Sequence, residues 1–143
     1  MSDILCIVPQ FSYGKLDSVG PKCPNLGIGI LAAVIEREGY EVKILDCFGH
    51  ELQEKQIYEE IEKEKPNIVM IGAVTANFTI TMNILKKVKE LFPKVVTIIG
   101  GPHVTVNPNS AFEQEGVDFV VRGEAEETIP ELLDLIKNKN EEE

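Results

Sequence analysis

Five short apolar segments recur along the chain, and each predicts a β-strand. Residues 4–8, 68–72 and 95–99 are almost continuously apolar, which is typical of strands buried on both faces of a sheet. Residues 41–45 alternate between apolar and polar side chains and predict a strand nearer an edge. Residues 117–121 supply the fifth segment.

Helical patterns separate these strands. The last one begins with Thr128-Ile129-Pro130-Glu131, which resembles a capping box with proline in the first turn. Five helices are expected. The first runs from a cap at Asn25 to a stop at Gly39, and the second contains Ile57 and Ile61 and ends before Pro66. The other three cover 80–91, 110–115 and the residues from Thr128 onward.

The alternation of strands and helices predicts a parallel sheet with helices on both faces. For five strands the expected order is 2-1-3-4-5, which is a flavodoxin-like (Rossmann-like) three-layer α/β sandwich. Such sheets bind ligands at the carboxyl ends of their strands, here beside the switch point between the first and third strands. We expect residues 1–138 to form this one domain, and 139–143 to be a polar tail or the start of a linker.

Composition narrows the possible partners. The 143 residues include 14 Lys and Arg against 24 Asp and Glu, a formal net charge of −10. So acidic a chain is a poor match to nucleic acid or to an anionic membrane surface. No apolar run is long enough to span a bilayer, and no basic segment precedes the first apolar run. We therefore expect a cytoplasmic protein.

The reactive side chains form no recognisable catalytic motif. Cys6, Cys23 and Cys47 have no metal-finger spacing and form no Cys-x-x-x-Cys-x-x-Cys triplet for an iron–sulfur cluster. We expect these cysteines to lie in the core or in loops. With no Ser/His/Asp or Cys/His arrangement either, the residues predict a binding module rather than a complete enzyme.

The loops after the strands hold the candidate binding residues. Gly100 and Gly101 end the fourth strand, where they either let a large ligand approach the backbone or only form a sharp turn. If they form a ligand slot, a valine at either position is expected to fill it and leave the domain folded. Thr75 and Asn77 follow the third strand and are candidates to bind an amide or phosphate, or to cap the next helix. His103 is expected to be a solvated hydrogen-bond donor rather than a metal ligand.

Other ligand classes of this fold lack their motifs here. A phosphate-accepting receiver domain needs carboxylates after the first and third strands, where residues 8–10 and 72–75 have none. Residues 27–29, Gly-Ile-Gly, lie too far from the first strand for a dinucleotide fingerprint and lack its third glycine. Residues 12–14, Ser-Tyr-Gly, resemble a flavodoxin phosphate loop only weakly, in having hydroxyl-bearing residues and a glycine after the first strand.

Three segments taken together resemble one known family. Residues 24–33 read Pro-Asn-Leu-Gly-Ile-Gly-Ile-Leu-Ala-Ala, residues 100–105 read Gly-Gly-Pro-His-Val-Thr, and residues 117–128 end in Gly-Glu-Ala-Glu-Glu-Thr. This combination resembles the N-terminal cobalamin-binding domain of cobalamin-dependent radical S-adenosylmethionine (SAM) enzymes, including the anaerobic magnesium-protoporphyrin ester cyclase type.

The resemblance implies a cobalamin whose corrin ring lies over the loops and whose nucleotide tail enters a slot beside Gly100 and Gly101. It also implies a radical SAM partner domain, in cis or in trans, for methyl transfer or ring formation. That domain would bring a 4Fe-4S cluster and SAM, neither of which this chain is expected to bind. The implied cofactor-binding residues are Gln10, Gly27, Thr75, Ala76, Asn77, Gly100, Gly101, Pro102, His103, Val104 and Glu124.

One segment departs from the better-known cobalamin domains. In mutases and methionine synthase an Asp-x-His-x-x-Gly motif follows the first strand and supplies the lower axial ligand. Here residues 9–14 read Pro-Gln-Phe-Ser-Tyr-Gly, without histidine. We therefore expect base-off cobalamin with no protein histidine on cobalt. The alternatives are a non-catalytic regulatory or interaction domain, or a flavin-type nucleotide binder of the same fold.

Overall fold

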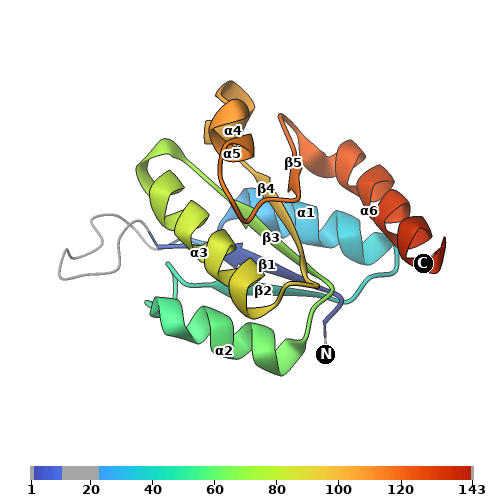
Figure 1. Ribbon diagram of the computed structural model, residues 1–143, viewed down its shortest axis with the longest axis horizontal. Helices are drawn as coiled ribbons and strands as arrows, with labels where there is room; N and C mark the ends of the chain where they lie inside the picture. Colours follow the sequence, from blue (N-terminus) through green and yellow to red (C-terminus); the bar gives the residue numbers. More distant parts are fainter. Residues whose placement is uncertain (1, 11–22, 143) are drawn as a thin grey trace.

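The computed structural model describes residues 2–10 and 23–142 of the chain, with side chains up to Lys139. Figure 1 shows the arrangement of the helices and strands. In chain order they are β1 (Ile4–Val8), α1 (Leu26–Arg37), β2 (Val42–Asp46), α2 (Glu54–Glu64), β3 (Ile68–Gly72), the 3₁₀ turn η1 (Thr75–Asn77), α3 (Phe78–Leu91), β4 (Val96–Gly100), α4 (Pro102–Val106), α5 (Asn109–Phe112), β5 (Phe119–Val120) and α6 (Ala125–Glu142).

Within the described residues, five parallel strands form one sheet in the order β2-β1-β3-β4-β5 (Figure 1). This confirms the flavodoxin-like arrangement expected from the strand and helix pattern. β3 and β4 pair in register to their last residues, so that Gly72 lies opposite Gly100. The carboxyl ends of these two central strands are therefore flush.

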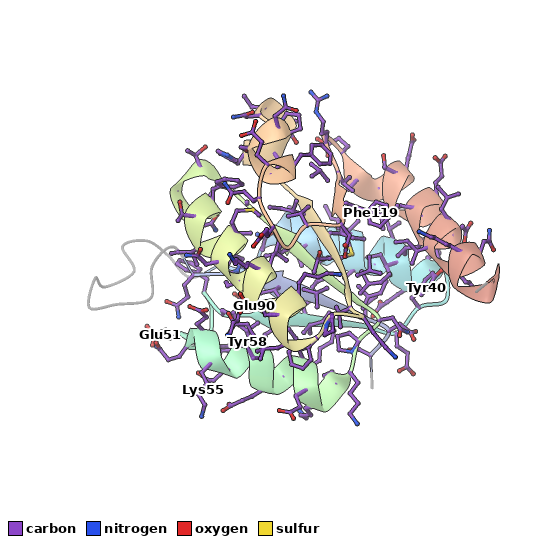
Figure 2. The ribbon with its side chains drawn as sticks, in the orientation of Figure 1. Tyr40, Glu51, Lys55, Tyr58, Glu90 and Phe119 are labelled. Carbon is purple, nitrogen blue, oxygen red and sulfur yellow. The ribbon has the colours of Figure 1, made fainter. Side chains whose placement is uncertain are left out.

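Two apolar layers cover the sheet, because successive strand side chains point to opposite faces. One layer packs strand residues such as Ile7 and Ile71 against α2 and α3. The other packs residues such as Cys6 and Met70 against α1 and α6, which lie side by side in Figure 1. Figure 2 labels Tyr58 of α2, which is partly buried against the first layer.

The C-terminal helix differs from expectation at its start. It begins at Ala125, not at the Thr128 capping box, and Pro130 lies inside it. Ile129 and Leu133 are at most 1% exposed, so their burial against α1 and the sheet holds the helix through the proline. The helix continues to Glu142, over positions that the sequence suggested were a tail.

Other boundaries also shift. β5 is reduced to Phe119–Val120, within the longer segment expected at 117–121. The short helix α4 and the turn η1 were not expected. Both follow carboxyl ends of central strands, which places them beside the predicted ligand site.

Candidate ligand-binding crevice

A cavity of about 650 Å³ opens at the carboxyl edge of the sheet. Its lining comes from the ends of β1, β3 and β4, from the residues after β5, and from the first turns of α1 and α6. It therefore lies on the sheet face that α1 and α6 cover. A cavity of this size is in the range that binds small molecules and cofactors.

Two paired glycines form the floor of this cavity. Gly72 and Gly100 lie opposite each other and follow Met70 and Ile98 on the same face of their strands. A Cβ atom placed on Gly72 would meet no atom within 4 Å, and one on Gly100 would meet only the Val121 carbonyl oxygen at 3.6 Å. The protein itself thus has room for side chains here, and their absence leaves the space for a ligand.

Gly101 has a different role from its neighbour. Its φ is +99°, and a Cβ atom there would lie 2.7 Å from the carbonyl oxygen of Ala73. The backbone at this point is tied to β3, because the Ala73 amide donates to Gly100 and the His103 amide donates to Ala73. A side chain at Gly101 would therefore disturb the fold, which corrects the expectation that valine at this position leaves the domain folded.

Hydrogen bonds at the first turns hold the walls of the cavity. The Asn25 side chain accepts from the Ile28 amide at 3.0 Å, which confirms the predicted cap of α1. At the carboxyl end of β4, the Thr105 hydroxyl donates to the Gly101 carbonyl and accepts from the Gly123 amide, both at 2.9 Å. Thr105 thereby joins α4 to the segment that leads into α6.

The lining is apolar with an acidic rim. Met70 and Ile98 lie deep in the cavity, while Glu124 and Glu126 come from the start of α6. Among the described residues that line it, there is no lysine, arginine or histidine. This environment suits a largely apolar group and disfavours a dianionic phosphate.

His103 lies outside the cavity lining, in a hydrogen-bonded cluster on α4. Its Nδ1 is 3.0 Å from the Thr75 hydroxyl, and its Nε2 is 3.2 Å from the Ser110 hydroxyl. Its ring stacks on Phe78, with centroids 4.0 Å apart. The cluster links the loop after β3 to the helices after β4.

The candidate residues named from the sequence divide into two groups. Gln10 donates to the Leu52 carbonyl at 2.6 Å, and Val104 is fully buried. Thr75 and Ala76 are exposed, in the stretch between the lining residues Val74 and Asn77. Those that line the cavity are Gly27, Asn77, Gly100, Gly101, Pro102 and Glu124; those that do not are Gln10, Thr75, Ala76, His103 and Val104.

Asn77 resolves one of the open alternatives. Its side-chain oxygen accepts from the Val74 amide at 2.9 Å, and it makes no side-chain cap bond to α3. Asn77 therefore caps the η1 turn that leads into α3, rather than α3 itself. Most of the long loop that follows β1, residues 11–22, lies outside the described residues.

Sequence reasoning missed Gly72 and Thr105. Gly72 had a usable signal, because aligning the ends of the two central strands places it opposite Gly100. Thr105 ends the 100–105 segment that carries the resemblance, but its role could not be predicted from that segment, since its two hydrogen bonds depend on how α4 packs beside the segment after β5.

The described residues contain no group of three His, Cys, Asp or Glu side chains that would hold a metal ion. Cys6 and Cys47 are buried and Cys23 is exposed, and all three are free thiols. Burial raises the pKa of the Cys6 thiol to about 12. No helix in the described part of the chain is long and apolar enough to cross a membrane.

Comparison with known proteins gives a consistent family. A family model described as the B12 binding domain matches residues 15–133. An uncharacterized methyltransferase of Pyrococcus horikoshii is 34% identical over 139 residues, covering 96% of this chain and 30% of that protein. The anaerobic magnesium-protoporphyrin IX monomethyl ester cyclase of Rubrivivax gelatinosus is 31% identical over 135 residues, covering 93% and 24%. The chain thus spans less than a third of either relative.

A solved structure shares the fold. The radical S-adenosylmethionine methyltransferase TsrM from Kitasatospora setae superposes with a TM-score of 0.78 at 19% sequence identity. The match covers 96% of this chain and 26% of that one. It confirms the flavodoxin-like architecture independently of the family match.

Proposed function

The chain belongs to the B12-binding domain family, and we propose that it holds base-off cobalamin for a radical SAM methyltransferase or cyclase. Cobalamin is its cofactor by family membership. The base-off state, the residues that bind the cofactor and the catalytic partner are the proposed parts. The observation that carries the proposed binding residues is the glycine-floored cavity at the carboxyl edge of the sheet, which has room for the tail of a base-off cobalamin.

The residues present fit the nucleotide tail of cobalamin. Side chains at Gly72 or Gly100 would enter the cavity, so a branched side chain at either position would occupy part of its floor. The apolar lining around Met70 and Ile98 suits an aromatic base. Bound cobalamin supplies a cobalt centre for one-carbon or radical chemistry. The chain's own residues bind and orient it and exclude water from the tail.

The proposal that no protein imidazole binds cobalt rests on where the two histidines lie. Residues 9–25 contain no histidine, and His50 is exposed, following β2 outside the cavity lining. Both ring nitrogens of His103 lie within hydrogen-bond distance of hydroxyl groups. Binding of His103 to cobalt would break one of these contacts, so we assign no imidazole to the metal.

The catalytic partner is proposed to be a radical SAM domain, in cis or in trans. Residues 1–143 lack the cysteine triplet that would hold its cluster. The two relatives, a methyltransferase and a cyclase, are much longer than the chain, which leaves room for a second domain. The structural neighbour is a radical SAM methyltransferase, which supports this choice of partner. Purified chain supplied with iron, sulfide, reductant and SAM is therefore expected to release no 5′-deoxyadenosine.

Retention of added cofactor tests the proposal. The purified chain is mixed with hydroxocobalamin, freed of unbound ligand by gel filtration, and examined by visible absorption. We expect retained corrin with a base-off spectrum and, in the cobalt(II) form, an electron paramagnetic resonance signal without nitrogen superhyperfine splitting. Splitting from a protein nitrogen would overturn the axial assignment.

The same experiment separates the alternatives. Flavin mononucleotide is added as a competitor. Its phosphomonoester carries up to two negative charges, against one on the phosphodiester of the cobalamin tail, so Glu124 and Glu126 at the rim are expected to disfavour it more. Retention of flavin in preference to corrin would support the nucleotide binder. A folded chain that retains neither ligand would support the regulatory or interaction domain.

A further inference from the structure

The hydrogen-bond directions around His103 follow from which atoms carry protons. The Ser110 hydroxyl lies 2.6 Å from the Asn107 carbonyl oxygen, which can only accept, so Ser110 donates there. The single proton of the Ser110 hydroxyl is engaged in that hydrogen bond. The Ser110 oxygen, 3.2 Å from His103 Nε2, must therefore accept a hydrogen bond from Nε2. In the neutral ring Nδ1 then carries no proton, so the Thr75 hydroxyl, 3.0 Å away, donates to it.

Two further contacts keep the ring beside these hydroxyl groups. Its face stacks on Phe78 with 4.0 Å between centroids. Its backbone amide is anchored to the Ala73 carbonyl at 3.1 Å. The Thr75 proton is therefore held toward His103, and the remaining lone pairs of this exposed hydroxyl face away from the ring.

Thr75 is exposed beside the cavity, so these lone pairs are accessible to a ligand bound there. It follows Val74 and precedes Asn77, both of which line the cavity, and it is exposed on the edge over which the corrin is proposed to lie. The corrin periphery ends in primary amides, which donate N–H groups. A hydrolysed side chain ends in a carboxylate, which near neutral pH only accepts.

We propose that His103 is a positioning residue that makes Thr75 an acceptor for one primary amide of the corrin and thereby disfavours a carboxylate at that place. This inference rests on the proposed cobalamin function. It assigns His103 no contact with cobalt. Because Thr75 is exposed, a mismatched carboxylate is expected to weaken binding by roughly three- to tenfold.

The tautomer is tested first without any ligand. Nitrogen-15 spectra of histidine-labelled protein in mildly alkaline buffer distinguish protonated from bare ring nitrogens, and His103→Gln assigns the signals of the two histidines. We expect His103 to carry its proton on Nε2, and Thr75→Val to shift the Nδ1 signal. A proton on Nδ1 of the neutral ring would overturn the inference.

Selectivity is then measured with hydroxocobalamin and the separate monocarboxylic acids in which one peripheral amide is hydrolysed. High salt screens the general repulsion from the acidic chain. We expect one isomer to bind the unmodified protein three- to tenfold more weakly than the other isomers. Thr75→Val should remove the discrimination against that same isomer.

Two substitutions of His103 separate positioning from structural support. His103→Asn keeps an amide oxygen near the position of Nδ1, and His103→Gln keeps a nitrogen near that of Nε2. We expect Asn to retain the discrimination and Gln to lose it, even where urea unfolding shows that both are destabilised. If the unmodified protein, Thr75→Val and His103→Gln all discriminate equally against that monocarboxylic acid isomer, the inference about His103 is overturned. The proposed cobalamin function would still stand in that case. Failure of the unmodified protein to bind hydroxocobalamin overturns the proposed function as well.

Discussion

The two faces of the sheet differ most at the carboxyl ends of β3 and β4. Toward α2 and α3, these strands present Ile71 and Ile99, which are at most 2% exposed in a filled apolar layer. Toward α1 and α6, the very next residues are Gly72 and Gly100, and the layer stops at the cavity. One residue step in each strand therefore separates a face that stabilises the fold from a face that has room for a cofactor.

Filling the open face is expected to have the largest effect. Gly100→Val or Gly72→Val should lower hydroxocobalamin affinity by at least about a hundredfold, because the side chain occupies the cavity floor. Stability should change by no more than about 1 kcal/mol, since valine is favourable in strands and its Cβ atom would meet no protein atom closer than 3.6 Å. Gel-filtration retention and urea unfolding measure the two effects. Tight binding by both variants would mean that the tail lies elsewhere.

Removing a side chain from the filled face should have the opposite effect: it should lower stability and leave cofactor affinity almost unchanged. Leu85 of α3 is fully buried in the layer against α2 and the sheet. Leu85→Ala is expected to cost about 3 kcal/mol of unfolding free energy through the cavity that it creates. Hydroxocobalamin affinity of the folded protein should remain within about twofold. A large loss of affinity would show that the two faces do not act independently.

Substitution of Gly101 tests whether this residue, unlike Gly100, is needed for the fold. A Cβ atom here approaches the Ala73 backbone to 2.7 Å at a φ of +99°, a conformation that costs other residues about 1–3 kcal/mol. Gly101→Ala should therefore be destabilised by at least about 2 kcal/mol, whereas Gly100→Ala should lose less than about 1 kcal/mol. Denaturant midpoints of this pair provide the comparison. Equal midpoints would contradict the assigned roles of the two glycines.

The contrast between the faces was only partly predictable from the sequence. The apolar runs at 4–8 and 68–72 were sufficient to predict buried parallel strands, because continuous burial leaves a local pattern. Gly100 and Gly101 were also found locally, but their different roles were not. Those roles depend on which face each glycine presents and on the distance from Gly101 to Ala73, which follow from strand pairing.

The helix ends show the same limit. The cap at Asn25 is a contact within three residues, and it was predicted correctly. The start of α6 was placed at Thr128 because Thr128 and Pro130 are good local signals. The apolar spacing of Ile129 and Leu133 is itself a local signal of burial, but their packing partners on α1 and the sheet lie far away along the chain, and this packing holds the helix through Pro130.

The smallest expected effect is on stability in acid, through the hydrogen bonds of Asp118 on the filled face of the sheet. Asp118 accepts hydrogen bonds from the Lys89 ammonium of α3 and from the Thr97 amide of β4, both at 2.8 Å. Partial burial opposes its ionisation, but these donors outweigh it and hold the pKa of this carboxyl below its ordinary value of 3.8. A lowered pKa in the folded state means that the unfolded chain takes up the proton first as pH falls.

The stabilisation by Asp118 is therefore complete above pH 3.8 and is lost as pH falls through the lower folded-state pKa. At neutral pH, Asp118→Asn should cost about 1 kcal/mol, a modest value because the carboxylate is partly exposed. Urea midpoints of the two proteins should converge in acid. Because these hydrogen bonds join α3 to β4 on the face away from the cavity, Asp118→Asn should leave hydroxocobalamin affinity at neutral pH unchanged. A constant difference between the midpoints at every pH would show that the hydrogen bonds do not depend on the charge of Asp118.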